Sequence, residues 1–334
     1  MRFVYSDIQS RHRPPQFLVR GQIKPCPEKP ERADALVGAI RARGAVVEAP
    51  DSYGSAPRAA VHSPDYLAFL ESAWTRWSAL PDAAASVIPN VHRNTDMAEY
   101  PRSIVGQAGG HMSDTACPIA EGTWEAACAS ADTAMHAARL VLSGATRTAY
   151  AVCRPPGHHA SRDMAGGFCY LNNAAIAAQA AFPSRAAILD VDVHHGNGTQ
   201  AIFYERDDVL TVSIHADPAE FYPFFAGYAH ERGRGFNLNL PLPIGTSEDR
   251  FLDAVDEAGA QIARFAPGLL VVSLGFDTYV ADPLAAFKVT TPGFARLGRK
   301  IADFDLPTVL IQEGGYDCEA LAANLSSFLD GLIR

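Results

Sequence analysis

Hydrophobic residues along this chain repeat with two different periods, and the two alternate regularly after Gly122. Apolar residues spaced three or four apart predict amphipathic helices, whereas short runs of aliphatic residues predict buried strands. By this criterion we expect helices over residues 30–43, 63–77, 123–142, 172–182, 248–265, from 291 onward, and over 318–333. We expect strands over residues 2–5, 148–153, 188–194, 209–214, 269–274 and 308–311. Strands that alternate with helices predict an α/β fold with a mainly parallel central sheet flanked by helices.

Two stretches of the chain lack either period. Residues 9–30 carry prolines and charges, so we expect a loop there. Residues 81–122 form a longer stretch without periodicity, and a loop of that length inside a compact domain usually serves as a lid or a subunit contact. No linker divides the chain, so we expect a single domain over residues 1–334 that carries this long loop.

Composition limits the classes of function. The chain has 334 residues, of which 48% are hydrophobic and 19% charged, as in a globular protein with a sizeable core. Its formal net charge of -9 and its lack of basic runs argue against nucleic acid or an anionic membrane as a partner. No apolar run approaches the ~18 residues of a membrane span, and the first residues lack a signal-peptide pattern. The six cysteines include no C-x-x-C pair, so we expect reduced thiols and a cytoplasmic protein.

The segment ILDVDVHHGNGT, residues 188–199, places ionisable side chains at every second position of a predicted strand. Asp190, Asp192 and His194 would therefore project from one face. Because buried carboxylates need a partner, a divalent metal ion is the simplest explanation of this pattern. Together with Asp277, which follows another predicted strand, Asp192 and His194 would make a three-ligand site with room for water and substrate. A ligand set of two oxygens and one nitrogen suits Zn2+ and does not exclude Fe2+, Co2+ or Mn2+.

Four motifs follow the carboxyl ends of predicted strands: RPPGHH, DVDVHH, LGFD and EGGY. Ligands bind at this edge of an open α/β sheet, so we expect the motifs to meet. The adjacent His158 and His159 could act as acid and base if their environments set different pKa values. Asp190 and Asn197 are available as their partners, one charged and one neutral. Tyr316 could donate its hydroxyl to an oxyanion, and the whole set then indicates metal-assisted hydrolysis of an amide.

Two aromatic residues could form the walls of an apolar slot beside these groups. Phe168 follows Gly166-Gly167, and Tyr222 precedes Pro223. On the sequence alone, both could equally be core aromatics. We expect His195 to be a structural neighbour of the site rather than a ligand.

The motifs CRPPGHHA, GGFCYLNNAA, ILDVDVHHGNGTQ, VVSLGFDT and EGGY occur in continuous order between about Gly122 and the C-terminus. In this order they resemble the histone deacetylase superfamily of metal amidohydrolases. FLESAWTRW, GTWEAA and HADPAEFYPFFAGYA are similar to the bacterial acetylpolyamine amidohydrolase branch, which extends the resemblance over nearly the whole chain. The resemblance implies an arginase-like α/β fold and hydrolysis of an acetyl amide on a primary amine, such as an acetylpolyamine or acetyl-lysine.

The resemblance also implies roles for individual residues. It implies zinc on Asp192, His194 and Asp277, a catalytic pair of His158 and His159, and Tyr316 as the group that polarises the carbonyl. It implies a structural potassium ion held by Asp190, Asp192, His194, Ser213 and Ile214, and a second monovalent ion near Phe203, Arg206 and Val209. It places Gly167, Phe168 and Tyr222 along the acyl-lysine-like channel. In the acetylpolyamine branch the long loop, here residues 81–122, helps to build a dimer and narrows the entrance, so a homodimer is expected.

Two positions depart from that branch. Its members carry acidic residues toward the distal ammonium of the substrate, where this chain has Phe17 and Ala116. Asp114 and Glu99 could substitute for them if the long loop folds them inward. With Phe17 as an apolar or cation–π surface at the entrance, we expect an enzyme that accepts neutral and aromatic acyl amides at least as well as acetylated polyamines.

Two other functions remain open. A ureohydrolase of the arginase type shares the fold and the Asp-His strand motif, but its two manganese ions would want more carboxylates, and Asn197 stands where an extra Asp could help. A non-catalytic binding protein would have no reason to keep the histidine pair, the three ligands and Tyr316 together. Counting bound metal ions separates the three possibilities: one zinc-type ion, two manganese ions, or none.

Overall fold

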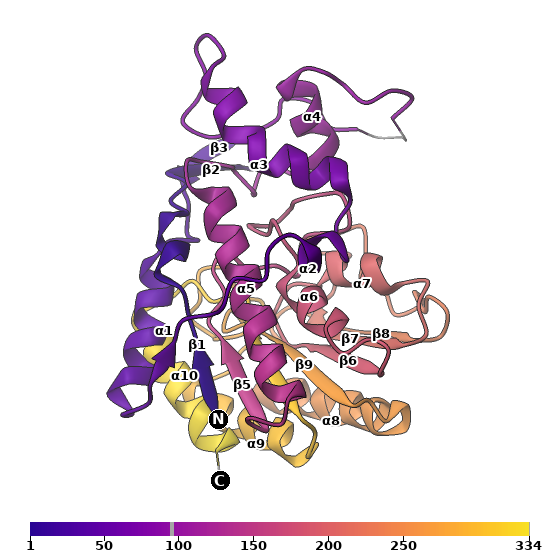
Figure 1. Ribbon diagram of the computed structural model, residues 1–334. Coiled ribbons are helices and arrows are strands. Elements are labelled where there is room, and N and C mark those ends of the chain that lie inside the picture. Colours follow the sequence, from indigo (N-terminus) through magenta and orange to yellow (C-terminus); the bar gives the residue numbers. More distant parts are fainter. Residues whose placement is uncertain (94–96, 334) are drawn as a thin grey trace.

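Eight strands form one parallel sheet in the computed structural model of this chain, which describes residues 1–93 and 97–333. Across the sheet the strands are ordered β4-β1-β5-β10-β9-β6-β7-β8 (Figure 1). Their bounds are Arg2–Val4 (β1), Val47–Glu48 (β4), Thr148–Ala151 (β5), Ala186–Asp190 (β6), Val209–Ala216 (β7), Asn237–Leu242 (β8), Leu269–Leu274 (β9) and Thr308–Gln312 (β10). Every residue of β6, β7, β9 and β10 is buried, which explains why their sequences are rich in aliphatic residues.

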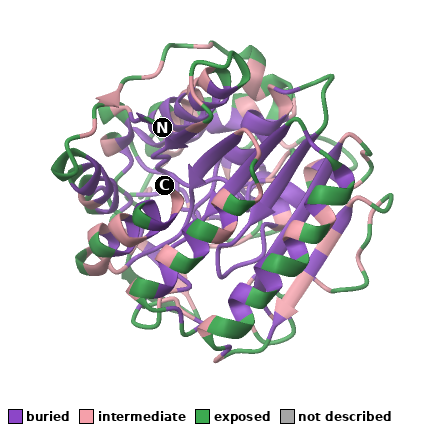
Figure 2. Cartoon of the chain, turned by 90° about the horizontal axis from the view of Figure 1, so that it is seen from below, coloured by how far each residue is buried: buried purple, intermediate pink, exposed green. Residues whose placement is uncertain are grey.

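Helices cover both faces of the sheet, so the molecule has three layers. One core cluster joins one face to α1 (Glu31–Ala42), α8 (Glu248–Phe265), α9 (Thr291–Asp303) and α10 (Cys318–Leu332). A second cluster joins the opposite face to α3 (Pro64–Ser78), α5 (Thr123–Leu142) and α6 (Asn173–Gln179). Leu270 of β9 belongs to the first cluster and Val271 to the second, as the two-residue period of a strand requires. Figure 2 shows buried strands behind helices that expose only their outer sides.

Several helices begin where the sequence supplies a capping side chain. The hydroxyl of Ser247 accepts a hydrogen bond from Arg250 N, at 3.4 Å, at the start of α8. The hydroxyl of Thr290 accepts one from Gly293 N, at 3.2 Å, at the start of α9. These bonds satisfy backbone N–H groups that have no partner within the first helical turn. The parallel sheet flanked by helices, predicted from the alternation of elements, is confirmed.

The expected loop at residues 9–30 contains regular structure, so that prediction is wrong. The 3-10 helix η1 (Asp7–Arg11) comes first, and strands β2 (Gln16–Val19) and β3 (Gln22–Pro25) then form an antiparallel hairpin. Only Phe17 among the hairpin residues is buried, so the hydrophobic pattern is too sparse to reveal the strands.

The stretch 81–122 is not a loop throughout, because it contains α4 (Ile104–His111); its residues 94–96 lie outside the described residues. The sequence of α4, IVGQAGGH, lacks a polar face and so lacks a helical period. The hydroxyl of Ser103 accepts from Val105 N, at 3.3 Å, at its start, and α4 packs against α3. The pattern also misses α2 (Ala56–Ala59), α7 (Asn197–Phe203) and β8.

The hairpin β2–β3, α3 and α4 lie together beyond one end of the sheet, at the top of Figure 1. The hairpin is tied to the segment that follows α4, because Thr115 Oγ1 donates to Leu18 O at 2.6 Å. The strands run parallel from the N-terminus at the bottom of Figure 1, so their carboxyl ends face these elements. Among the described residues, no helix has the length and apolar character needed to cross a membrane.

Candidate active site

The four motifs lie at the carboxyl ends of the neighbouring strands β5, β10, β9 and β6. One expectation is wrong: β6 ends at Asp190, so Asp192 and His194 lie beyond the strand. Beyond Asp190, two backbone N–H groups bond to carboxylates: Asp192 N donates to Asp190 Oδ1 at 3.1 Å, and His194 N donates to Asp192 Oδ1 at 2.9 Å. Such local bonds compete with a strand for backbone N–H groups, and here they still bring the side chains together.

Asp192, His194 and Asp277 each place one ligand atom within 4.8 Å of the others. His194 Nδ1 lies 3.1 Å from Asp192 Oδ1 and 3.1 Å from Asp277 Oδ2. The backbone approaches closely at Gly314, whose N–H donates to Asp192 Oδ2 at 2.7 Å. A Cβ atom at this position would lie 2.1 Å from Asp277 Oδ2, so the approach requires glycine.

The two carboxylates of this group repel each other. Burial and the negative charge of Asp192 raise the pKa of Asp277 to about 7. Burial disfavours a charge on His194, but its hydrogen bonds to the two carboxylates outweigh burial and raise its pKa to about 9. A divalent cation among the three ligand atoms would compensate both carboxylates and bind the Nδ1 lone pair of the imidazole. The donor set therefore fits the metal ion implied by the sequence.

His158 and His159 lie beside these ligands, with ring centroids 4.0 Å apart. His158 Nδ1 lies 2.9 Å from Asp190 Oδ2, and His159 Nδ1 lies 2.7 Å from Asn197 Oδ1. Burial disfavours the charge on His158, but Asp190 and Asp192 outweigh it and raise its pKa to about 10. Burial and the charge of His158 lower the pKa of His159 well below its ordinary value. The pair therefore combines one cationic and one neutral imidazole.

Tyr316 follows the Gly-Gly turn after β10, and its buried ring lies 5.6 Å from that of Phe168. The guanidinium of Arg32 lies 4.7 Å from the centre of the Tyr316 ring. Arg32 also donates to two carbonyls of the turn, Glu313 O and Gly315 O, each at 2.5 Å. Burial raises the pKa of Tyr316 well above its ordinary value, so the hydroxyl keeps its proton and can donate a hydrogen bond.

Arg32 and its partner Glu28 are site residues that the sequence analysis missed. Arg32 Nη1 donates to Glu28 Oε1 at 2.8 Å, and Arg154 Nε lies 2.9 Å from the same oxygen. Burial alone would raise the pKa of Glu28, but the two guanidinium groups and His12 outweigh it and hold the pKa well below its usual range. The four-residue spacing of Glu28 and Arg32 was an available signal, but Glu28 falls in the stretch expected to be a loop.

Phe168 and Tyr222 flank the histidine pair. The ring of Tyr222 lies 4.9 Å from that of His159, edge to face. Gly167 and Phe168 have positive φ angles of 48° and 67°, and a Cβ atom at Gly167 would lie 2.4 Å from His159 Cδ2. Phe17 packs edge-on against Phe168 at 5.5 Å and is only 8% exposed. It supports Phe168 from behind instead of presenting an open surface.

Asp114 is folded inward, whereas Glu99 is exposed and Ala116 packs against the aromatic cluster around Phe168. Asp114 Oδ2 accepts hydrogen bonds from Tyr222 OH at 2.6 Å and from Gly167 N at 3.1 Å. Asp114 Oδ1 accepts one from Ala116 N at 2.8 Å. This carboxylate therefore joins the long segment to both walls of the slot.

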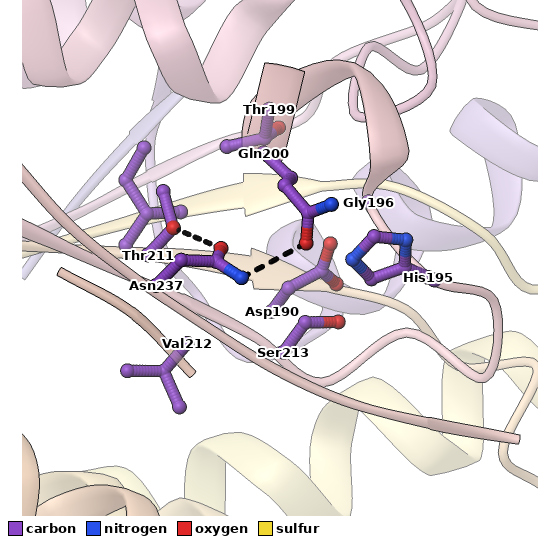
Figure 3. A pocket seen from close by; sticks show the side chains of 10 residues that line it. Asp190, His195, Gly196, Thr199, Gln200, Thr211, Val212, Ser213 and Asn237 are labelled. Atoms are coloured by element: carbon purple, nitrogen blue, oxygen red, sulfur yellow. Dashed lines mark hydrogen bonds between the residues drawn. The ribbon is translucent and has the colours of Figure 1, made fainter. Parts of the chain in front are cut away.

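A polar cavity of about 10 Å³ lies beside Asp190, the partner of His158 (Figure 3). Its polar lining includes Asp190, His195, Thr199, Gln200, Ser213 and Asn237. His195 Nδ1 is buried without a hydrogen-bond partner, and the volume holds about one water-sized sphere. An oxygen-rich cavity of this size fits a water molecule or a small cation.

Of the five residues expected to bind potassium, Asp190 and Ser213 line this cavity. Asp192, His194 and Ile214 are close to them in the sequence but are not part of its lining. Of the second expected monovalent site, Phe203 ends α7 and Val209 begins β7, and Arg206 lies in the connection between them, where its Nε donates to Asp208 Oδ1 at 2.8 Å.

The chain is similar to known proteins over nearly its whole length. Residues 26–332 match the histone deacetylase domain family. The acetylpolyamine amidohydrolase of Burkholderia pseudomallei is 51% identical over 97% of this chain and 96% of that protein. Acetylpolyamine amidohydrolase 1 of Pseudomonas aeruginosa is 45% identical over 98% of this chain and 97% of that protein.

Solved structures extend the similarity to the fold. The crystal structure of the acetylpolyamine aminohydrolase from Burkholderia pseudomallei, from an iodide soak, superposes with a TM-score of 0.96 at 50% identity and covers 99% of this chain and 98% of its own. The HD domain of HDA15 superposes with a TM-score of 0.80 at 27% identity and covers 100% of this chain and 91% of its own. The chain therefore belongs to the histone deacetylase domain family.

Proposed function

We propose that this protein is a metal-dependent amidohydrolase that removes the acetyl group from acetylated primary amines. The observation that carries the proposal is the meeting of a three-ligand metal set, an asymmetric histidine pair and a buried tyrosine hydroxyl at one edge of the sheet. The names of the relatives at 51% and 45% identity support acetylpolyamines as substrates, with acetyl-lysine as a second class.

Asp192, His194 and Asp277 would hold the metal ion, for which we propose zinc, with Fe2+ or Co2+ as alternatives. When bound, such an ion supplies a Lewis acid that polarises the acetyl carbonyl and acidifies water. Asp190 and Ser213, with the neighbouring residues of the polar cavity, would hold a structural potassium ion away from the reacting atoms.

His159 is the proposed general base. Its Nδ1–H donates to Asn197 Oδ1 at 2.7 Å, which leaves the lone pair on Nε2 free to accept a proton from the attacking water. The low pKa of its ring keeps His159 neutral before the reaction. Asn197 fixes the orientation of the ring without adding the negative charge that would favour its protonated form.

His158 and Tyr316 act on the two groups that change charge during the reaction. Tyr316 donates its hydroxyl proton in a hydrogen bond to the carbonyl oxygen as negative charge develops there. His158, which is held as a cation by Asp190, gives the Nε2 proton to the departing nitrogen when the C–N bond breaks. The products are acetate and the free amine.

The match to the histone deacetylase domain family weighs against the ureohydrolase alternative. A second group of possible metal ligands within the described residues is His158, Cys169 and Glu313. In this group, His158 Nδ1 lies 2.9 Å from Asp190 Oδ2, and Glu313 Oε2 accepts two backbone hydrogen bonds, so both side chains already have partners within the chain.

The test is a turnover panel on the zinc-loaded protein, together with elemental analysis. We expect acetate release from acetylputrescine, acetylspermidine or acetyl-lysine peptides, and one transition metal ion per chain. Asp192→Ala, His194→Ala and Asp277→Ala should each lose metal retention and activity together, whereas the control Asp207→Asn, at an exposed carboxylate, should lose neither. Two stoichiometric transition metals per chain would favour a ureohydrolase, and a folded, loaded protein that hydrolyses none of the amides would contradict the proposal.

A further inference from the structure

Glu313 is a fully buried carboxylate that the proposed mechanism leaves without a role. It follows β10 directly and precedes the turn that carries Tyr316. Its Oε2 accepts hydrogen bonds from Gly157 N at 2.7 Å and from His158 N at 3.1 Å. Its Oε1 accepts one from Ser273 Oγ, on β9, at 3.3 Å. One side chain thus connects the carboxyl ends of three adjacent strands.

The turn that Glu313 holds is the one that carries both histidines. A Cβ atom at Gly157 would lie 2.4 Å from Asn173 N and 2.6 Å from Leu171 O, so the turn is tightly packed against the start of α6. The carboxylate oxygen of Glu313 satisfies two buried N–H groups of the same turn. A buried donor that loses its partner bears the full cost of its desolvation, so the turn would have to shift if this acceptor were removed.

The backbone of Glu313 is also fixed by hydrogen bonds. Its carbonyl oxygen accepts a hydrogen bond from Arg32 Nη2 at 2.5 Å and another from Gln312 Nε2 at 3.2 Å. Two residues later, the carbonyl oxygen of Gly315 accepts a hydrogen bond from Arg32 Nε at 2.5 Å. The side chain of Glu313 therefore holds the histidine turn, while its backbone belongs to the turn that presents Tyr316.

We propose that Glu313 is a positioning residue, which sets the distance between the histidine pair and Tyr316 by accepting the hydrogen bonds of Gly157 N and His158 N. This inference rests on the proposed amide hydrolysis, in which the base, the acid and the oxyanion donor must act on one carbonyl group. A misplacement of such groups by about 1 Å can lower turnover roughly 10²-fold without touching the reacting atoms.

The role requires an acceptor oxygen and not a charge. Burial raises the pKa of Glu313 to about 7, so its neutral form is accessible near neutral pH. In that form Oε2 still accepts from the two backbone groups, and Oε1–H can donate to Ser273 Oγ. A glutamine side chain has the same shape, with a carbonyl oxygen for the turn and an NH2 group for the serine.

The experiment compares Glu313→Ala, Glu313→Gln and Ser273→Ala in the zinc-loaded full chain. Glu313→Ala should lower kcat roughly 10²-fold while KM stays within about threefold of the wild type. Glu313→Gln should keep kcat within about fivefold, because it keeps the acceptor. Ser273→Ala, the matched control, removes the hydrogen bond of Glu313 that does not reach the histidine turn and should behave like the wild type.

Hydrogen exchange gives a readout that does not depend on turnover. The peptide containing residues 155–160 should exchange faster in Glu313→Ala than in the wild type, and Glu313→Gln should restore protection. If the wild type hydrolyses no acetylated amine, the proposed function fails, whereas this comparison still tests the positioning role.

Two outcomes would overturn the inference. One is a folded Glu313→Ala protein with wild-type kcat and unchanged exchange over residues 155–160. The other is a Glu313→Gln protein as impaired as Glu313→Ala, which would assign the role to the charge. If Glu313→Ala does not fold, Glu313→Asp replaces it, because that variant withdraws the acceptor by one methylene group; a kcat equal to that of Glu313→Gln would then contradict the inference.

Discussion

At the residue scale, the two histidines of the RPPGHH turn differ because each has one distinct neighbour. The carboxylate of Asp190 stabilises the protonated form of His158, whereas the amide of Asn197 orients His159 without favouring its charge. The hydroxyl of Tyr316 is similarly controlled by its surroundings, since burial keeps it protonated. Adjacent residues of one type thus acquire different chemistry from partners that are distant in the sequence.

Tyr316→Phe should remove the oxyanion donor and leave the rest of the site in place. We expect kcat to fall roughly 10²–10³-fold, the usual loss for one donor of this kind, with unchanged metal content and circular dichroism. His159→Ala should be at least as damaging, because it removes the proposed base. Steady-state kinetics on the best acetylated amine checks both, and turnover like that of the wild type in Tyr316→Phe would exclude the hydroxyl from the mechanism.

Glu28→Gln should destabilise the fold in a pH-dependent way. The pKa of Glu28 is depressed in the folded state, so its stabilisation is present above the unfolded value of ~4.3 and is lost as the pH falls toward the folded pKa. At pH 7 we expect the variant to lower the free energy of unfolding by about 3–5 kcal/mol, because it leaves buried guanidinium charges without their partner.

Urea unfolding at pH 7 and at pH 3.5 to 4 checks this prediction. The difference between wild type and Glu28→Gln should shrink at the lower pH, and a difference independent of pH would contradict the assignment. Glu257→Gln serves as the control, because its ion pair with Arg250 is half exposed and should contribute at most about 1 kcal/mol.

At the scale of elements, the site is completed by segments outside the sheet. The hairpin β2–β3 places Phe17 against Phe168, and the segment after α4 places Asp114 between Gly167 and Tyr222. The loop after β7 carries Tyr222 itself. In the proposed mechanism, the carboxyl ends of the strands supply the reacting groups, and these covering segments shape the slot through which a substrate would pass.

Asp114→Ala should loosen both walls of the slot. The variant removes the carboxylate that accepts from three donors, Tyr222 OH, Gly167 N and Ala116 N, and a hydrogen bond to a charged group contributes about 1.5–3 kcal/mol. We therefore expect kcat/KM to fall about 10–100-fold, mainly through KM. Glu99→Gln, which changes an exposed acid of the same segment, should have no effect. Unaltered kcat/KM in Asp114→Ala would mean that the tie between the segment and the slot is dispensable.

At the scale of the whole molecule, the net charge of -9 attracts cationic amines. Dissolved salt screens this attraction beyond about 10 Å at an ionic strength of about 0.1 M. However, Phe17, which is buried against Phe168, and Ala116 stand where acids were expected, and Asp114 is engaged in hydrogen bonds. The local preference for a cationic tail is therefore weaker than the overall charge would imply.

We expect acetyl-lysine with a bulky amide cap to be hydrolysed at least as efficiently as acetylspermidine or acetylputrescine. The measurement is the ratio of the two kcat/KM values at low and at high salt. A strong preference for the acetylpolyamines that fades with added salt would show that acidic residues do guard the entrance.

The long segment also bears on assembly, and we expect a homodimer that uses residues 81–122. Part of this segment is ordered within the chain, because Ser103 caps α4 and α4 packs on α3. The segment nevertheless exposes Val91 and Tyr100 by 51% and 40%, apolar surface that a second copy would cover. Sedimentation velocity at micromolar concentration checks this prediction. A stable, fully active monomer would indicate that the segment serves as a lid and not as a subunit contact.

Properties of this protein that depend on neighbouring residues could be predicted from the sequence, and properties that depend on contacts between distant segments could not. The sequence by itself determined the parallel α/β order and the meeting of four motifs at one edge, because apolar periods and strand ends are local properties. Hairpin β2–β3 and helix α4 escaped prediction because their order comes from contacts with distant segments, such as Thr115 with Leu18.

Only the tertiary structure decided how the site is finely arranged. It ended β6 at Asp190, buried Arg32 against Tyr316 and Glu28, and turned Asp114 inward. It also separated the pKa values of the two adjacent histidines. These features depend on burial and on charges brought together from distant parts of the chain. A local pattern, such as the four-residue spacing of Glu28 and Arg32, can indicate a contact but does not show that it is buried.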